Sequence, residues 1–374
     1  MNDFTVRIDE REIDDLRDRL ARTRWPEHET VDDWSQGIPL AYTQELCAYW
    51  AEEYDFGFAD RINAFPQLRL DIDGLGVHVL HVRSPEPDAL PLVLTHGWPG
   101  SVVEFLKVLG PLTDPRAHGG DPADAFHVVA PSLPGYGWSD KPTVAGWGVP
   151  HIATAWATLM RELGYTRYGA QGGDWGAGIT TTMGEQQPDG LIGIHVNMAV
   201  APPDPSMMDD LTPAEQKALD DLGEHMRSGT GYSTQQSTRP QTLGYGLTDS
   251  PAGQCAWIAE KFWAWTDCNG HPENALTKQE MLDNISVYWF TQTAASSARL
   301  YWESFRASHS SEVTVPTGIS IYPREIIRPS RRWCEKRYTD IRWYEELDRG
   351  GHFAAFEQPE SFVEQVRGFF RLVR

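Results

Sequence analysis

Cysteine, long apolar runs and positive charge are all scarce in this chain. Its four cysteines, Cys47, Cys255, Cys268 and Cys334, lie far apart among 374 residues and form no C-x-x-C pair. In a chain of this size, that spacing predicts reduced, buried thiols and argues against a disulfide framework or a zinc site. Because no His-x-x-x-His helix or cluster of carboxylates replaces them, we expect neither a metal nor another cofactor.

The charge balance argues against further classes of protein. The chain has 53 acidic and 32 basic residues, a net charge of -21. An acidic surface repels the phosphates of nucleic acids and of anionic membranes. The opening stretch "MNDFTVRIDEREIDDLRDRL" has neither the apolar core of a signal peptide nor the ~20 apolar residues of a membrane span. We therefore predict a cytoplasmic protein that binds neither nucleic acid nor membrane, and the sequence leaves a homodimer open.

Apolar strands alternate with helices along most of the chain, with two interruptions. Residues 1–66 have the pattern of a helical, irregular meander, and residues 202–311 are mostly helical. In residues 67–201 and 312–374 the alternation is regular, which is typical of a parallel sheet covered on both faces. We predict one α/β domain with a mostly parallel central sheet flanked by helices. The helical segment forms a lid inserted before the last two strands.

The stretch "GAQGGDWGAGIT", residues 169–180, has the pattern of a nucleophile turn and carries an acid, Asp174, at its centre. A strand leads into a small–x–nucleophile–x–small pattern and then into a helix, which is the nucleophile elbow of α/β-hydrolases, usually written G-x-S-x-G. Asp174 stands where Ser is usual, at a helix N-terminus that favours negative charge. An ordinary helix-capping Asp explains the local pattern equally well.

Two further segments favour a catalytic interpretation. "THGWPGS" ends an earlier strand, and an H-G-x-P turn at that place can direct a backbone N–H at an oxyanion. We predict that the N–H groups of Trp98 and Trp175 form the oxyanion hole. In "RGGHFAAFEQPESF", His352 follows the last expected strand, where an α/β-hydrolase keeps its base.

The acid that orients His352 is expected after the preceding strand. "TGISIYPREI" ends that strand close to Glu325, which fits the position, and Asp340 is the main alternative. Three other carboxylates fit less well because they lie within or after the last expected strand: Glu345, Glu346 and Asp348.

The elbow Asp, "HGWPGS", "YPRE" and "GGHFAAFEQPE" together resemble the epoxide hydrolases of the α/β-hydrolase fold, specifically the microsomal and juvenile-hormone type. The resemblance covers nearly the whole chain: "FTVRIDEREIDDLRDRLARTRWP" is similar to the N-terminal meander of that group, and "TDSPAGQCAWIAEKFWAWTD" to a stretch of its lid. Membrane-bound members carry an N-terminal anchor that this sequence does not show, so the chain resembles the soluble bacterial members.

This resemblance implies that an epoxide is opened by Asp174 and released as a vicinal diol. Attack by an acid forms an ester, which water can hydrolyse, whereas attack by Ser would form an ether that resists water. The family mechanism splits one difficult step into two easier ones. His352, oriented by Glu325, would activate the water for the second step.

In that family, two lid tyrosines donate hydrogen bonds to the epoxide oxygen, and a positioned acid of this kind is worth about 10²–10⁴-fold in rate. The resemblance places them at Tyr232 in "SGTGYSTQQ" and Tyr301 in "SSARLYWES". Tyr245 and Tyr288 are the alternatives. The 15 tryptophans can serve core packing or line a pocket for a bulky apolar ligand, and composition does not separate the two. The Trp-rich lid suggests a bulky, aromatic epoxide, from detoxification or from natural-product biosynthesis.

Two other functions remain open. A haloalkane dehalogenase also uses an Asp at the elbow, but the lid, the N-terminal region and the paired tyrosines favour an epoxide hydrolase. A non-catalytic α/β-hydrolase-like binding protein would need none of Asp174, Glu325 and His352. A Ser esterase is poorly supported because the chain contains no G-x-S-x-G.

Overall fold

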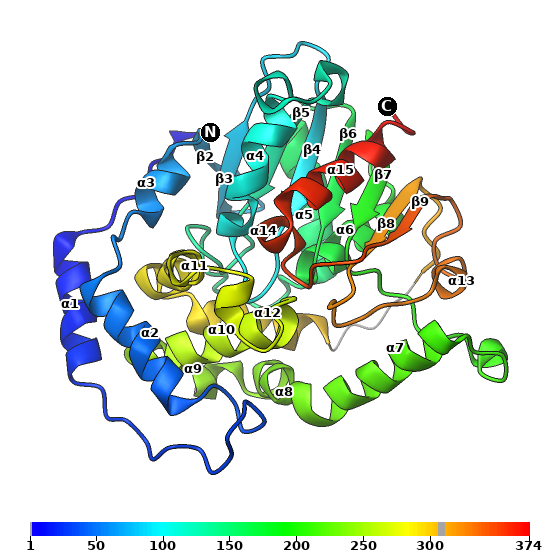
Figure 1. Cartoon of the computed structure of the whole chain (residues 1–374). Helices are drawn as coiled ribbons and strands as arrows, with labels where there is room; N and C mark the ends of the chain where they lie inside the picture. Colours follow the sequence, from blue (N-terminus) through cyan, green and yellow to red (C-terminus); the bar gives the residue numbers. More distant parts are fainter. Residues whose placement is uncertain (1, 306–310) are drawn as a thin grey trace.

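The computed structural model describes residues 2–305 and 311–374, and its centre is a nine-stranded sheet (Figure 1). The order of the strands is β1-β2-β3-β5-β4-β6-β7-β8-β9. The pairs from β1 to β5 along this order are antiparallel, and all pairs from β5 to β9 are parallel. The strands are β1 (Asn2–Asp3), β2 (Gln67–Ile72), β3 (Leu75–Val82), β4 (Leu90–Thr95), β5 (Phe126–Pro131), β6 (Tyr168–Gly172), β7 (Leu191–Val196), β8 (Thr317–Ile321) and β9 (Ile341–Glu346).

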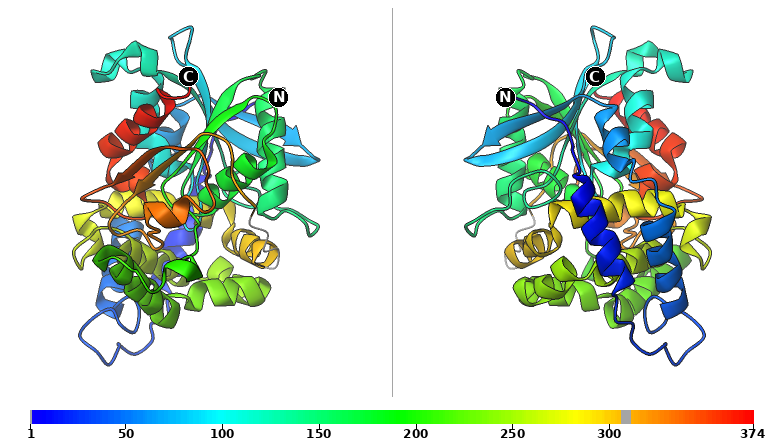
Figure 2. Two further views of the ribbon diagram at one scale, coloured as in Figure 1. Left: turned by 90° about the vertical axis from the view of Figure 1, so that its right-hand side faces the viewer. Right: turned by 90° about the vertical axis from the view of Figure 1, so that its left-hand side faces the viewer.

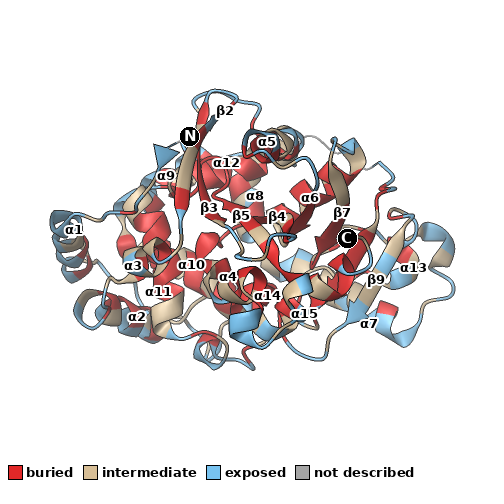
Figure 3. Cartoon of the chain, turned by 90° about the horizontal axis from the view of Figure 1, so that it is seen from above, coloured by how far each residue is buried: buried red, intermediate tan, exposed pale blue. Residues whose placement is uncertain are grey.

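Helices cover both faces of this sheet, as the apolar strands predicted. Every residue of β6 and β8 is buried, which requires cover on each side. Helices α5 and α6 pack together on one face, and α4, α14 and α15 lie on the other (Figure 3). Their bounds are α4 (Leu106–Thr113), α5 (Val149–Glu162), α6 (Trp175–Gln186), α14 (Ala354–Glu357) and α15 (Pro359–Phe370). A short helix α13 (Arg331–Cys334) lies between β8 and β9.

The predicted lid lies between β7 and β8 and gathers at one end of the sheet (Figures 1 and 2). Because parallel strands finish at the same edge, this is the end where β4 and β6 lead into their loops. Residues 306–310, which the prediction includes in the lid, lie outside the described residues. The lid helices are α7 (Pro213–Glu224), α8 (Gly231–Thr238), α9 (Pro240–Asp249), α10 (Pro251–Trp265), α11 (Lys278–Thr291) and α12 (Ala294–Ser304).

The N-terminal segment contacts both the lid and the sheet. Helices α1 (Glu10–Ala21) and α2 (Leu40–Glu52) pack against α10, as Figure 2 shows from the side, and α3 (Phe58–Asn63) leads into β2. The segment also supplies β1, in which Asn2 pairs with Arg69. The sequence predicts only a helical, irregular segment here, because a strand of two residues is too short to show alternation.

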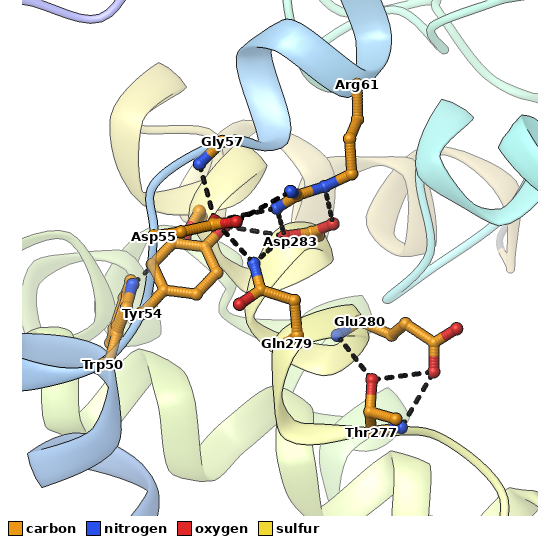
Figure 4. Close-up of polar contacts among 10 residues, drawn as sticks. Trp50, Tyr54, Asp55, Gly57, Arg61, Thr277, Gln279, Glu280 and Asp283 are labelled. Carbon is orange, nitrogen blue, oxygen red and sulfur yellow. Dashed lines mark hydrogen bonds and ion pairs between the residues drawn. The ribbon is translucent and has the colours of Figure 1, made fainter.

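An ion pair with a buried carboxylate joins the N-terminal segment to the lid (Figure 4). Arg61 of α3 donates two hydrogen bonds to Asp283 of α11, from Nε at 2.7 Å and from Nη2 at 2.6 Å. Tyr54 adds a third, from its hydroxyl, at 2.8 Å. Only 6% of the Asp283 side chain is exposed. This carboxylate therefore relies on protein partners in place of water.

All four cysteines are buried free thiols, as their spacing predicted. Among the described helices, none combines the length and the apolar character that a membrane crossing requires.

Replacement of Asp283 by Ala is expected to lower the free energy of unfolding by about 2 kcal/mol, because the buried hydroxyl of Tyr54 loses its acceptor and the half-buried Arg61 keeps only Asp55. Urea denaturation followed by circular dichroism measures the loss. Glu224→Ala is the control, because its partner Arg227 and Glu224 itself are both largely exposed. A change within about 0.5 kcal/mol is expected there. Equal losses in the two variants would contradict the anchoring role of Asp283.

Candidate active site

Asp174 occupies a sharp turn between β6 and α6. Its backbone has φ 51° and ψ -128°, a conformation that costs a residue with a side chain about 1–3 kcal/mol. The turn brings α6 against the end of β4: a Cβ atom at position 176 would lie 1.9 Å from the carbonyl oxygen of Thr95. Only glycine fits at position 176, which explains the small residue two positions after Asp174. Strain of this kind is typical of functional sites.

The loop that follows β4 holds one oxygen of this carboxylate. The backbone N–H of Trp98 donates to Asp174 Oδ1 at 2.7 Å. A Cβ atom at position 97 would lie 2.0 Å from the same oxygen, so Gly97 makes the approach possible. Trp175, the other expected donor, is the first residue of α6, where a backbone N–H has no acceptor within the helix.

His352 lies between two carboxylates. Its Nε2 is 3.2 Å from Asp174 Oδ2, and its Nδ1 is 2.6 Å from Glu325 Oε1. The imidazole is 4% exposed and Glu325 is 3% exposed. The lid contacts the loop that carries His352, because the backbone N–H of His352 donates to the carbonyl of Trp265 at 2.9 Å. The three residues therefore form a continuous chain of contacts in which His352 and Glu325 are buried and Asp174 is partly exposed.

The other carboxylates weighed for this position lie elsewhere. Asp340 pairs with Arg342 near the surface. The remaining three are exposed: Glu345, Glu346 and Asp348.

The charges on both sides of His352 control its protonation. Burial by itself lowers the pKa of the imidazole, but the charge of Glu325 and the hydrogen bond and charge of Asp174 outweigh it. As a result the pKa of His352 is raised well above its usual value. If the carboxylate of Asp174 were neutralised, that part of the increase would disappear.

The two expected tyrosines meet above the elbow. Tyr232 of α8 stacks on Trp98 with ring centroids 5.1 Å apart, and Tyr301 of α12 meets Trp98 edge-on at 5.9 Å. Their own rings are 5.8 Å apart. Burial and the charge of Asp174 raise the pKa of both phenols, so both hydroxyls keep their protons at neutral pH and can donate hydrogen bonds.

The alternative tyrosines do not join this group. Tyr245 is 70% exposed. The hydroxyl of Tyr288 is buried and donates to the carbonyl of Gly100 at 2.7 Å.

A further acid, Glu104, was not singled out in the sequence. Together with Asp174 and His352 it lines a cavity of about 20 Å³, enough for one water molecule. Burial and the charge of Asp174 raise the pKa of Glu104 to about 8, against the opposing effect of His352. Its carboxyl takes the space that a side chain at position 100 would fill. Gly100 in "HGWPGS" indicates that another group packs against the backbone at this position. Only the structure shows that this group is the carboxyl of Glu104.

The site thus combines a strained carboxylate, an imidazole with an orienting acid, and two phenols. In residues 2–305 and 311–374 the structure shows no group of three or more His, Cys, Asp or Glu side chains able to hold a metal ion.

Comparison with known proteins identifies the family. Residues 1–105 match the family described as epoxide hydrolase N terminus, and residues 91–233 match the alpha/beta hydrolase fold. The chain is 54% identical to a protein of Stigmatella aurantiaca named "Putative epoxide hydrolase", over 99% of this chain and 85% of the relative. The chain belongs to the epoxide hydrolase family. It is also 34% identical to epoxide hydrolase 1 of Oryctolagus cuniculus, over 99% of this chain and 88% of that protein.

Solved structures of epoxide hydrolases share the fold over the whole chain. The Aspergillus niger epoxide hydrolase has a TM-score of 0.91 and 30% identity, covering 100% of this chain and 96% of that one. The juvenile hormone epoxide hydrolase of the silkworm Bombyx mori has a TM-score of 0.89 and 31% identity, covering 100% and 95%. The predicted α/β-hydrolase fold and the resemblance to the epoxide hydrolases are both confirmed.

Neutralising either carboxylate beside His352 is expected to lower the pKa of the imidazole. Glu325→Gln and Asp174→Asn each remove a charge that favours the protonated ring. NMR titration of labelled histidine measures the shift, and Asp340→Asn is the matched control because Asp340 pairs with Arg342 instead. An unchanged pKa in both test variants would contradict this account.

The same shift has a consequence for stability. Because folding raises the pKa of His352, the protonated ring contributes stability that is fully present below the unfolded value of about 6.5. This contribution is lost as the pH rises through the folded value. We expect Glu325→Gln to lose more stability at pH 5 than at alkaline pH, measured by urea denaturation.

Proposed function

We propose that this epoxide hydrolase converts an epoxide and water to a vicinal diol through a covalent ester on Asp174. One observation carries the proposal: a single carboxylate lies within hydrogen-bonding reach of a backbone N–H at 2.7 Å and of a buried imidazole at 3.2 Å, beneath two tyrosines. A helix cap would need neither the imidazole nor the tyrosines.

In the first step, the Asp174 oxygen that faces His352 attacks a carbon of the epoxide ring. Oδ1 is held by Trp98 and becomes the ester carbonyl, so Oδ2 is the attacking atom. The hydroxyls of Tyr232 and Tyr301 hold the epoxide oxygen and stabilise the negative charge that develops as the C–O bond breaks.

In the second step, water cleaves the ester. Ester formation removes the charge of Asp174, which lowers the pKa of His352, so the ring releases its proton to solvent and becomes a neutral base. The ring takes a proton back from solvent when the carboxylate of Asp174 is restored at the end of the cycle. His352 takes a proton from water, and Glu325 stabilises the imidazolium. The N–H groups of Trp98 and Trp175 hold the oxyanion on Oδ1.

We infer that the substrate is a bulky, aromatic epoxide from the kind of side chain that gathers near Asp174. The rings that gather above it belong to both the core and the lid: Trp98, Trp175, Tyr232, Trp265, Tyr301 and Phe305. Such rings bind flat apolar groups by stacking and by edge contacts.

Asp174→Asn is expected to lower diol formation from styrene oxide by about 10⁴-fold, because the amide is a poor nucleophile. Mass spectrometry of the intact variant excludes deamidation to Asp, and Asp340→Asn is the matched control. His352→Ala is expected to accumulate an ester on Asp174, detected as an added substrate mass. Undiminished diol formation by Asp174→Asn would reject the mechanism, and bromide release from a bromoalkane would favour a dehalogenase.

Glu104 is proposed to hold the hydrolytic water beneath His352. Glu104→Gln is expected to slow ester hydrolysis by about tenfold, since the water loses one of the contacts that orient it, while ester formation changes by less than about twofold. Single-turnover measurements with tryptophan fluorescence separate the two steps. Glu280→Gln, a lid residue outside the cavity, is the control. Equal slowing of both steps would contradict the proposed role.

A further inference from the structure

Lys261 is a buried cation that the mechanism above does not use. It lies on α10 of the lid and is 6% exposed. Lysine is rarely buried, because taking an ammonium out of water is costly unless the charge finds partners. One partner is the carboxylate of Glu260, the preceding residue, with which Lys261 forms an ion pair.

The other partners of Lys261 are the faces of aromatic rings in the active site. Its Nζ lies 4.5 Å from the ring centroid of Tyr232 and 5.5 Å from that of Trp265. Both distances are within the range of cation–π attraction. The same ring of Tyr232 stacks on Trp98, whose N–H holds Asp174. The ammonium therefore belongs to the packed group that surrounds the reacting carboxylate.

We propose that Lys261 is a positioning residue that makes Tyr232 the proton donor to the epoxide oxygen, by holding an ammonium over its ring. This inference rests on the proposed function. As Asp174 Oδ2 bonds to carbon and the epoxide C–O bond breaks, the departing oxygen takes the proton of Tyr232. The phenolate that remains carries its charge beside the ammonium, which stabilises it.

The proton balance closes in the second step. His352 accepts one proton of the water and delivers it to the diol oxygen that leaves the ester. The other proton of that water is released when Asp174 becomes a carboxylate again, and it returns to Tyr232. No reactant beyond the epoxide and water is needed.

The surroundings of Tyr232 explain why a cation is needed. Burial raises the pKa of its phenol, and the negative charges of Asp174, Glu260 and Glu325 raise it further, although Tyr301 opposes this. A phenol among carboxylates is a poor proton donor unless positive charge lies nearby.

The two tyrosines therefore have different tasks. The rings packed against Tyr301 are those of Trp98 at 5.9 Å, Trp175 at 4.7 Å, Phe305 at 5.7 Å and Tyr232 at 5.8 Å. The ammonium of Lys261 lies over the ring of Tyr232. We infer that Tyr301 stays protonated and donates a hydrogen bond, while Tyr232 gives up its proton.

The test uses the whole enzyme with styrene oxide and measures ester formation and ester hydrolysis separately in single turnovers. Lys261→Met keeps the length of the side chain and removes the charge, and it is expected to slow ester formation about tenfold while hydrolysis changes by less than about twofold. Lys261→Arg is expected to recover most of the rate. Lys278→Met is the matched control, since Lys278 lies 5.7 Å from the ring of Tyr49, outside the active site.

A double-mutant cycle with Tyr232→Phe then asks whether Lys261 acts through the phenol. In the Tyr232→Phe background, Lys261→Met is expected to change ester formation by less than about twofold, because no phenol remains to be assisted. A purely structural role would slow both steps, and would do so in either background. Lys261→Gln, whose amide still hydrogen-bonds to Glu260, replaces Lys261→Met if that variant does not fold.

Several results would overturn the inference: unchanged ester formation in Lys261→Met, equal slowing of both steps, additive effects in the cycle, or failure of both neutral variants to fold. The last would show that Lys261 serves the fold itself. Failure of the proposed function looks different, because the wild-type enzyme would then form no ester on Asp174 with any epoxide.

Discussion

The close approach of one carboxylate to the backbone sets the geometry of everything around it. Asp174 can lie against the loop after β4 only because Gly97 has no side chain, and its turn can reach that loop only because Gly176 has none. In return, the N–H of Trp98 holds one carboxylate oxygen and leaves the other facing His352. Two strand ends and one imidazole thus hold the proposed nucleophile from three sides, which is the pre-organisation that covalent catalysis requires.

One imidazole and three acids are titratable groups at the centre of this site. The imidazole lies between two carboxylates, with the third acid, Glu104, on the same small cavity. Because these groups lie away from bulk solvent, where the local dielectric is low, each charge acts strongly on the others. Changing Asp174 from an anion to a neutral ester therefore alters the protonation of His352, which couples the two steps of the proposed reaction.

The lid is part of the site and not only a cover. It supplies Tyr232, Tyr301 and Lys261, and its Trp265 accepts the backbone N–H of His352 at 2.9 Å. A second link is made by Glu357, which accepts the backbone N–H of Asp267 at 2.8 Å. The N-terminal segment in turn holds the lid through the Arg61–Asp283 pair (Figure 4). The N-terminal segment therefore supports the lid, and the lid in turn contacts the loop that carries His352.

Local pattern alone determined the parallel sheet, the acid at its elbow and the position of the histidine, because strand periodicity and tight glycine turns leave a short-range signature. It could not decide between Asp340 and Glu325, or between the candidate tyrosines, since these choices depend on which side chains meet across more than 20 residues of chain. The places of Glu104 and Lys261 beside the site were equally absent from the local pattern. In the sequence, Glu104 and Lys261 have the pattern of ordinary helix residues. Only tertiary packing takes them away from bulk water.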